Sequence, residues 1–326
     1  MNKKLLAIAV GAAFSAIPMM ASAGVTVYGH AQVEVGTRDN GTTDQTIVED
    51  NARGRIGFKA SEKLGNGMTA IAKYEFRTDT ADNRRTADGG ALTGREAFVG
   101  LKGGFGTVQA GALKSGYKYT GGVKYDPFVA TLLEARGANG MSGGELGNGR
   151  YGHNSFLGNS VGYMTPKMGA FSAWATFSPD EGDGTGGDYS FGLKFAQKAW
   201  EVFVAGVRND ETVGTGGDAI KFGGMYKFGN FKVVGQFETL SFEAAGKDDT
   251  EIYFLGGQAK FGNNVIVAQF GNKDPGGTAS DLDYFTVGLI HNLSKKTRLT
   301  AGFRSYDNAG GASETETFAV GMRMKF

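Results

Sequence analysis

Apolar and polar residues alternate along most of this chain with a period of two. The final segment shows the pattern most clearly, with one apolar set of alternate positions and one small, polar or charged set: Phe318, Val320, Met322, Met324 and Phe326 against Thr317, Ala319, Gly321, Arg323 and Lys325. Successive side chains of a β-strand point to opposite faces, whereas a helix repeats its apolar positions every three or four residues. The alternation therefore predicts strands.

The whole chain after residue 23 can be divided into such segments. We count sixteen, at residues 25–35, 52–60, 68–78, 94–102, 107–113, 158–165, 170–178, 188–196, 199–209, 218–228, 231–243, 250–261, 264–271, 282–292, 297–306 and 315–326. The connections alternate between short turns and long loops, and the longest of them is 114–157. An even strand number with this alternation is typical of a transmembrane, antiparallel, up-and-down β-barrel. We predict that all-β fold, with the turns on the periplasmic side and the loops on the extracellular side.

Each predicted strand has one apolar face and one charged face. In a soluble sandwich the apolar faces would cover each other, whereas around a barrel of about sixteen strands they face lipid and the interior is wide enough for water. The polar faces carry many charges, which in the barrel would line the lumen: Arg53, Arg55, Lys59, Lys73, Glu75, Arg77, Lys194, Lys221, Lys232, Glu238, Arg304 and Arg323. Aromatic residues near strand ends, among them Tyr28, Trp200 and Phe261, are expected at the membrane interface, although strand propensity alone also favours them.

The composition fits a barrel better than a disordered chain. The sequence has 55 glycines, which often indicates disorder, but it also has 24 phenylalanines and only 5 prolines. Glycines within strands, as at 223–224 and 256–257, permit a curved wall or a close contact between barrels, or they reflect simple tolerance of small residues. No apolar run after residue 23 is as long as a membrane helix, which argues against a helical membrane protein.

Residues 1–23 have the features of a secretory signal peptide. Lys3 and Lys4 precede an uncharged apolar stretch, and Ala21-Ser22-Ala23 matches the rule of small residues at a cleavage site. We therefore expect residues 24–326 to form the barrel. Removal of residues 1–23 takes away two lysines, so the formal charge falls from +1 to −1. This balance gives no indication of nucleic-acid binding, and the absence of cysteine excludes disulfides.

Four segments resemble one known family. They are 25–29 (VTVYG), 95–108 (REAFVGLKGGFGTV), 159–166 (NSVGYMTP) and the final Phe326. On these segments the chain resembles the general porins of Gram-negative bacteria, in particular the sixteen-stranded type of Neisseria, Burkholderia and related β-proteobacteria. It departs from them at Ala112 and Phe156, where the family usually has arginine, and both changes remove a positive charge near the expected pore throat.

The resemblance implies a passive pore for small hydrophilic solutes and ions, weakly charge-selective, in the outer membrane. It further implies a homotrimer in contact with outer-membrane lipid and lipopolysaccharide, and recognition of Phe326 by the barrel-assembly machinery. The third extracellular loop would fold into the lumen and narrow it. In this family a basic wall faces acidic residues of that loop. The residues expected at the constriction are Arg53, Arg55, Lys73 and Arg77 on the wall and Asp126, Glu134 and Glu145 on the loop.

Other functions fit the sequence less well. A barrel hydrolase needs a paired serine and histidine, but His30 and His291 have opposite parities and His153 lies in the long loop, so no catalytic residues are expected. A channel specific for a sugar or an organic acid would need an aromatic track, for which Tyr117, Tyr119 and Tyr125 are the clustered candidates. Calcium could bind loosely to the acidic loop 180–183, but no metal-ligand spacing is diagnostic, and the sequence indicates no cofactor.

Overall fold

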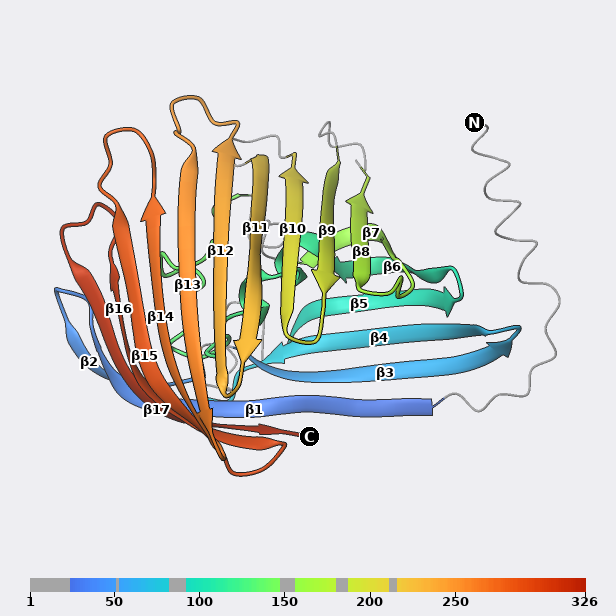
Figure 1. The fold of residues 1–326 in the computed structure, drawn as a ribbon, viewed down its shortest axis with the longest axis horizontal. Helices are drawn as coiled ribbons and strands as arrows, with labels where there is room; N and C mark the ends of the chain where they lie inside the picture. Colours follow the sequence, from blue (N-terminus) through green and yellow to red (C-terminus); the bar gives the residue numbers. More distant parts are fainter. Residues whose placement is uncertain (1–23, 51–52, 82–91, 147–155, 180–186, 211–215) are drawn as a thin grey trace.

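The computed structural model describes residues 24–50, 53–81, 92–146, 156–179, 187–210 and 216–326. The expected signal peptide lies outside the described residues. The described chain is almost entirely β-structure, in agreement with the alternating pattern (Figure 1). The strands are β1 (Gly24–Asp39), β2 (Asp44–Glu49), β3 (Gly54–Gly65), β4 (Met68–Thr78), β5 (Leu92–Gly103), β6 (Gly106–Lys114), β7 (Phe156–Met164), β8 (Phe171–Ser178), β9 (Asp188–Ala196), β10 (Trp200–Asn209), β11 (Gly217–Phe228), β12 (Phe231–Phe242), β13 (Thr250–Phe261), β14 (Asn264–Asp274), β15 (Leu282–Asn292), β16 (Thr297–Asp307) and β17 (Glu314–Lys325).

The strands form one closed antiparallel sheet. Each strand from β3 to β17 pairs with its neighbour in sequence, and β1 closes the ring by pairing with both β17 and β3. At the seam, the backbone N–H of Gly29 donates to Phe326 at 3.2 Å, and that of Phe326 donates to Gly29 at 3.1 Å. Closure leaves no edge strand with unpaired backbone N–H and C=O groups, and a sheet in hydrocarbon requires this. The predicted barrel is confirmed.

One strand was not predicted. Between the predicted strands 25–35 and 52–60 the sequence indicated no strand, whereas β1 continues to Asp39 and the chain returns as β2 before β3 begins at Gly54. β2 pairs with the end of β1 and β3 pairs with its beginning, so the two share one position in the wall. The seventeen strands therefore occupy sixteen positions. Polar residues at both ends of this hairpin hid its alternation.

The two faces of the wall differ as expected. Large apolar side chains are exposed on the outside all around the barrel, for example Val99 at 62% and Leu255 at 61%, while the inward positions are mainly polar. Aromatic residues are exposed near the short turns, including Trp200, Phe228 and Phe261. Tyr28 does not belong to this outer belt, because its hydroxyl donates to Glu75 of β4 inside the lumen at 2.8 Å. No helix in the described part is both long and apolar enough to cross a membrane.

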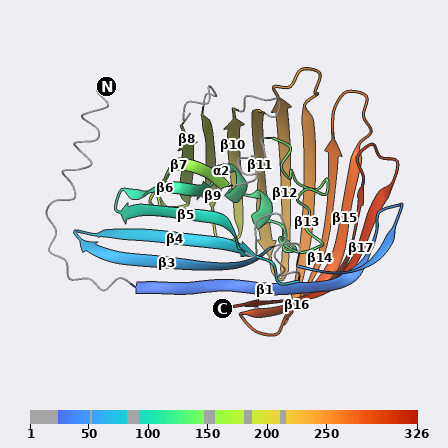
Figure 2. The ribbon, with the colours of Figure 1, turned by 180° about the vertical axis from the view of Figure 1, so that it is seen from behind.

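The longest connection, residues 115–155 between β6 and β7, is described up to residue 146, and we call it loop 3. It contains two short helices, α2 (Gly116–Tyr119) and η1 (Gly122–Lys124). Its chain lies inside the ring of strands, as the view from behind shows (Figure 2). Wall glycines make room for it: a Cβ at Gly302 would lie 2.8 Å from Leu133, and a Cβ at Gly271 would lie 2.4 Å from Gly140. Part of the glycine content thus serves a contact within the barrel.

Candidate functional site

Loop 3 is held against the wall by hydrogen bonds to inward side chains of strands far away in sequence. The hydroxyl of Tyr117 donates to Glu238 on β12 at 2.9 Å. The backbone N–H of Leu132 donates to Glu34 on β1 at 2.8 Å, and Arg323 on β17 donates to the carbonyl of Ala130 at 2.9 Å. Apolar side chains of the loop, Phe128 and Leu133 among them, are fully buried against the wall. The loop is therefore a packed part of the barrel interior.

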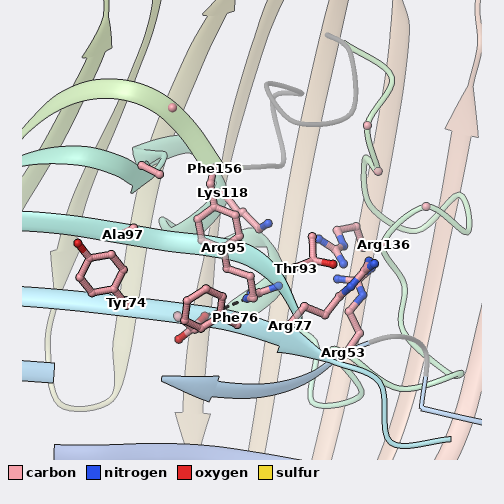
Figure 3. A pocket seen from close by; sticks show the side chains of 17 residues that line it. Arg53, Tyr74, Phe76, Arg77, Thr93, Arg95, Ala97, Lys118, Arg136 and Phe156 are labelled. Carbon is pink, nitrogen blue, oxygen red and sulfur yellow. Dashed lines mark hydrogen bonds and ion pairs between the residues drawn. The ribbon is translucent and has the colours of Figure 1, made fainter. Parts of the chain in front are cut away.

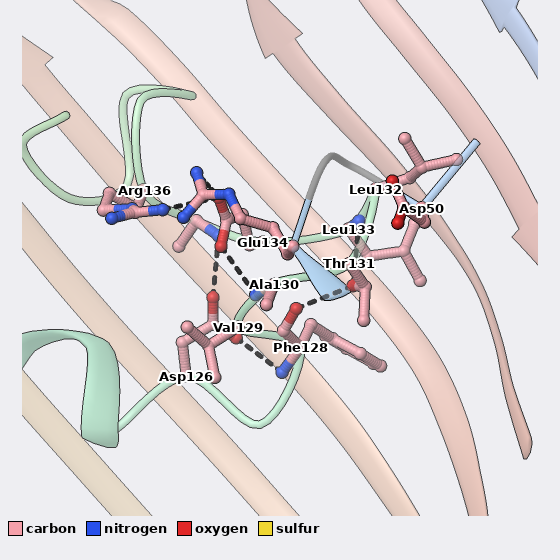
Figure 4. Close-up of polar contacts among 12 residues, drawn as sticks. Asp50, Asp126, Phe128, Val129, Ala130, Thr131, Leu132, Leu133, Glu134 and Arg136 are labelled. Atoms are coloured by element: carbon pink, nitrogen blue, oxygen red, sulfur yellow. Dashed lines mark hydrogen bonds and ion pairs between the residues drawn. The ribbon is translucent and has the colours of Figure 1, made fainter. Parts of the chain in front are cut away.

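Asp126 fixes the local conformation of loop 3. Its carboxylate accepts hydrogen bonds from the backbone N–H groups of Phe128 and Ala135, both at 2.8 Å, and from Gln269 on β14 at 3.0 Å (Figure 4). Burial raises the pKa of Asp126 to about 6, although the bonds from Ala135 and Gln269 favour the charged form. Asp126 thus acts within the loop and toward β14, and among the described residues it forms no ion pair with the predicted basic wall.

Glu134 joins loop 3 to the basic wall. Its Oε1 lies 3.0 Å from Nη2 of Arg53, which directly precedes β3, and 3.2 Å from Nη2 of Arg136 in the loop itself. Its Oε2 accepts a hydrogen bond from the backbone N–H of Ala130 at 2.7 Å (Figure 4). This carboxylate is buried whereas Arg53 is partly exposed, so the guanidinium still presents positive charge to the open space.

A second set of ion pairs runs across β3, β4, β5 and β6. Glu75 accepts from Nε of Arg95 at 2.9 Å and lies 3.2 Å from Nζ of Lys73 and 3.9 Å from Arg55. Lys73 also pairs with Glu96, whose carboxylate lies 3.1 Å from Lys114. Cations outnumber carboxylates in this network. The wall is therefore held rigid by ion pairs and still keeps a positive excess.

These groups border a cavity of about 850 Å³ between the wall and loop 3 (Figure 3). Five of the side chains that line it are cationic: Arg53, Arg77, Arg95, Lys118 and Arg136. Glu75 is the lining carboxylate among the described residues. Arg77 is exposed and forms no ion pair with any described residue. The cavity is therefore lined mainly by positive charge.

Phe156, at the start of β7, contacts two of these cations. Nζ of Lys118 lies 4.7 Å from its ring centroid, and the guanidinium of Arg95 lies 4.8 Å from the same centroid (Figure 3). Burial lowers the pKa of Lys118 to about 7, and the positive charges of Arg95 and Arg53 act in the same direction. An aromatic face attracts cations, so Phe156 holds Lys118 of the loop beside Arg95 of the wall.

The structure brings together part of the predicted constriction. Arg53 contacts Glu134, Arg55 and Lys73 contact Glu75, and Arg77 lines the same cavity. Glu145 instead pairs with Lys273 on β14 at 3.2 Å. The sequence reading did not assign Arg95, Lys118 or Arg136 to the throat, nor Glu75 and Glu96 as partners of the wall. The alternation had already placed Glu75 in the lumen, whereas nothing in the sequence fixed the path of loop 3.

The residues considered for a substrate-specific channel or a hydrolase do not form such a site among the described residues. Tyr117 and Tyr125 of loop 3 are buried against the wall, and the ring centroid of Tyr119 lies 6.3 Å from that of Trp174, so the three tyrosines form no exposed aromatic track. His30 contacts the carbonyl of Arg53, and His291 contacts Asn264. His153 and the acidic loop 180–183 lie outside the described residues. In the part of the chain that is described, no three metal-ligating side chains come together.

Comparison with known proteins agrees with the barrel fold. A family model described as Gram-negative porin matches residues 6–311. The major outer membrane protein P.IB of Neisseria gonorrhoeae is 32% identical over 64% of this chain, but the match spans only 57% of that protein. Outer membrane porin protein 32 of Delftia acidovorans is 27% identical over 100% of this chain and 93% of its own length. The solved structure of an anion-selective porin from Comamonas acidovorans superposes with a TM-score of 0.81 at 22% identity, covering 94% of this chain and 100% of that one.

The family model covers nearly the whole barrel, and the related proteins are named as outer-membrane proteins. A closed barrel with an apolar exterior also suits a membrane and not an aqueous compartment. The chain therefore belongs to the Gram-negative porin family and resides in the bacterial outer membrane.

Proposed function

We propose that this porin is a passive diffusion channel for small hydrophilic solutes and ions, and that it acts as a channel and not as an enzyme. The observation that carries the proposal is the open cavity of about 850 Å³, bordered by charged wall residues and loop 3. A solute in such a passage keeps contact with water and with charged groups, so it crosses without entering hydrocarbon. Size and electric field then decide which solutes pass.

The throat has one strongly charged side. Eight cationic groups belong to the wall network and the cavity, against three carboxylates: Arg53, Arg55, Lys73, Arg77, Arg95, Lys114, Lys118 and Arg136 against Glu75, Glu96 and Glu134. This excess supports a weak preference for anions. Ala112 and Phe156 line the same cavity where the family usually has arginine, which supports weak and not strong selectivity. The constriction that we propose comprises Arg53, Arg55, Lys73, Arg77 and Glu134, with Asp126 and Glu145 fixing the loop.

We also propose a homotrimer. The outer face of β1 and β3 to β6 carries small aliphatic side chains, among them Val25, Val27, Ala60, Ala72 and Ala110. Small residues let two barrels approach closely in a membrane. The proposed partners further include lipopolysaccharide and other outer-membrane lipid around the remaining face, and the barrel-assembly machinery through the exposed ring of Phe326. Light scattering of the protein in detergent tests the trimer.

We also propose that signal peptidase cleaves the chain after Ala23. The mass of the protein isolated from outer membranes tests this cleavage.

Planar-bilayer recording tests the channel directly. The purified protein should produce stepwise, ohmic conductance increments, and a salt gradient should give a reversal potential on the anion-selective side of zero. Current that saturates with one sugar or organic acid would instead favour a substrate-specific channel. Lack of any conductance from correctly folded barrels would contradict the proposal.

A further inference from the structure

Cations are concentrated at the short-turn end of the lumen, away from the throat. Lys227 lies between the exposed outer residues Tyr226 and Phe228, and Lys232 between Phe231 and Val233, so strand alternation turns both lysines toward the lumen. Cationic residues near the short turns of other strands have the same inward parity, and Lys124 of η1 in loop 3 lies at the same end. We call this group the inner vestibule, and it comprises Lys59, Lys63, Lys102, Lys124, Lys194, Lys227, Lys232, Lys260, Arg298 and Lys325.

Cations outnumber carboxylates in the inner vestibule, where Glu201 faces Lys124, Lys194 and Lys232, and Asp126 and Glu34 face Arg298. In the described part of the chain, the one ion pair formed by these ten cations is Lys194 with Glu201, at 4.0 Å. Lys227 and Lys232 lie directly opposite each other on neighbouring strands, an arrangement that like charges disfavour. Lys124 of loop 3 lies in the field of Lys194 and Glu201 as well. Such unfavourable spacing of like charges is relieved when an anion binds between them.

Arg298 adds hydrogen-bond donors to this end of the lumen. Its Nη1 donates to the carbonyl of Pro127 in loop 3 at 3.3 Å, but its Nε and Nη2 are buried without a hydrogen-bond partner among the described residues. Buried donors without partners are uncommon in folded proteins. Arg298 lies directly opposite Arg323 on β17, and Lys325 follows two residues later on the same face of that strand. Carboxylate and phosphate oxygens match this donor set.

The opposite rim of the barrel carries the opposite charge. Three carboxylate pairs lie opposite each other on neighbouring strands there, at positions with the parity of outward residues: Asp39 with Glu316, Glu251 with Asp274, and Asp307 with Glu314. They make the outer edge of the long-loop rim negative. An anion that approaches from the short-turn side meets the inner vestibule. The charge distribution makes the two entrances unequal.

We propose that the inner vestibule is a binding site for compact anions with three or more negative charges, entered from the short-turn side and distinct from the throat. This proposal rests on the proposed channel function, because block of ion flow requires a barrel that conducts ions. A multivalent anion bridges several lysines at once, whereas chloride does not. Bound there, it sits below the throat and blocks ion flow.

Inorganic tripolyphosphate, added to one side of a planar bilayer, tests the site. The chain has no cysteine, so a Ser294→Cys variant, labelled from one side by an impermeant thiol reagent, reports which side carries the short turns. Half-block should need an about tenfold lower concentration from the short-turn side than from the long-loop side. The difference should disappear at 1 M salt, where the Debye length is about 3 Å.

Two matched fourfold variants separate the vestibule from general surface charge. Lys124→Gln, Lys194→Gln, Lys227→Gln and Lys232→Gln together should abolish the sidedness, whereas the turn-tip variant Lys167→Gln, Lys198→Gln, Lys295→Gln and Lys296→Gln should retain it. Equal block from both sides in the wild-type protein, or equal loss in both variants, would overturn the proposal. Calorimetric titration of the detergent-solubilised barrel measures tripolyphosphate binding without any need for conductance. Binding without conductance would contradict the channel alone, whereas conductance without binding would contradict the anion site alone.

Discussion

Arg53 and Glu134 are 81 residues apart in sequence, yet the guanidinium of one lies 3.0 Å from the carboxylate of the other. The pair joins the barrel wall to loop 3 at the edge of the cavity. Since Glu134 also contacts Arg136, removal of Arg53 alone leaves the loop acid neutralised and subtracts one positive charge from the throat.

Neutralisation of the wall should therefore weaken anion preference. We expect the triple variant Arg53→Gln, Arg55→Gln and Arg77→Gln to move the reversal potential in a salt gradient toward the cation side. A unit charge at about 4 Å in water contributes about 1 kcal/mol, so the permeability ratio should change by roughly fivefold or more. The control is Arg208→Gln. The guanidinium of Arg208 lies 2.7 Å from the carboxylate of Asp218, and Arg208 does not line the cavity. An unchanged reversal potential in the triple variant would show that these three arginines do not determine ion selectivity.

Lys118 should make selectivity depend on pH. Its pKa is lowered to about 7, chiefly by burial and then by Arg95, Arg53 and Arg55, while Glu134 opposes the shift. Below that pKa the ammonium is protonated, so a fall from pH 8.5 to pH 5.5 adds one positive charge to the throat. Anion preference should rise over this range with a midpoint near pH 7. In Lys118→Gln the step should be absent; a step of equal size in that variant would assign it to another group.

Phe156 should set how much positive charge the throat presents. Phe156→Arg places a third cation beside Arg95 and Lys118, so we expect stronger anion preference and a smaller conductance. Phe156→Leu keeps an apolar side chain but removes the aromatic ring that both cations contact, and it should release Lys118 without adding charge. Reversal potential and single-channel conductance measured together distinguish the two effects. Identical behaviour of both variants would show that the ring has no such role.

Leu133 should determine how firmly loop 3 is docked. Its side chain is fully buried and lies against the wall at Gly302. Truncation of a buried leucine costs about 2–5 kcal/mol, so Leu133→Ala should loosen the loop, increase open-channel noise and admit larger polyethylene glycols. Leu255→Ala is the matched control, because that side chain is 61% exposed on the outer face. Equal noise in both variants would mean that the loop does not limit the passage.

The wall could be predicted from sequence because each strand obeys a local rule. Apolar residues such as Val320 and Met322 alternate with inward ones whatever the rest of the chain does. Loop 3 follows no such rule. Asp126 and Glu134 are similar acids in sequence, but one is enclosed by its own loop and Gln269 while the other meets Arg53. Their different roles depend on the path of the loop across β14 to β17, which long-range packing against wall glycines determines.

The central claim is that a charged, water-filled passage between loop 3 and the arginine wall carries ions. Single-channel recording of the wild-type barrel in a salt gradient tests it most directly. We predict discrete conductance steps with a reversal potential on the anion side that shifts toward cations when Arg53, Arg55 and Arg77 are neutralised. Folded barrels that insert into the bilayer but conduct no ions would contradict the account.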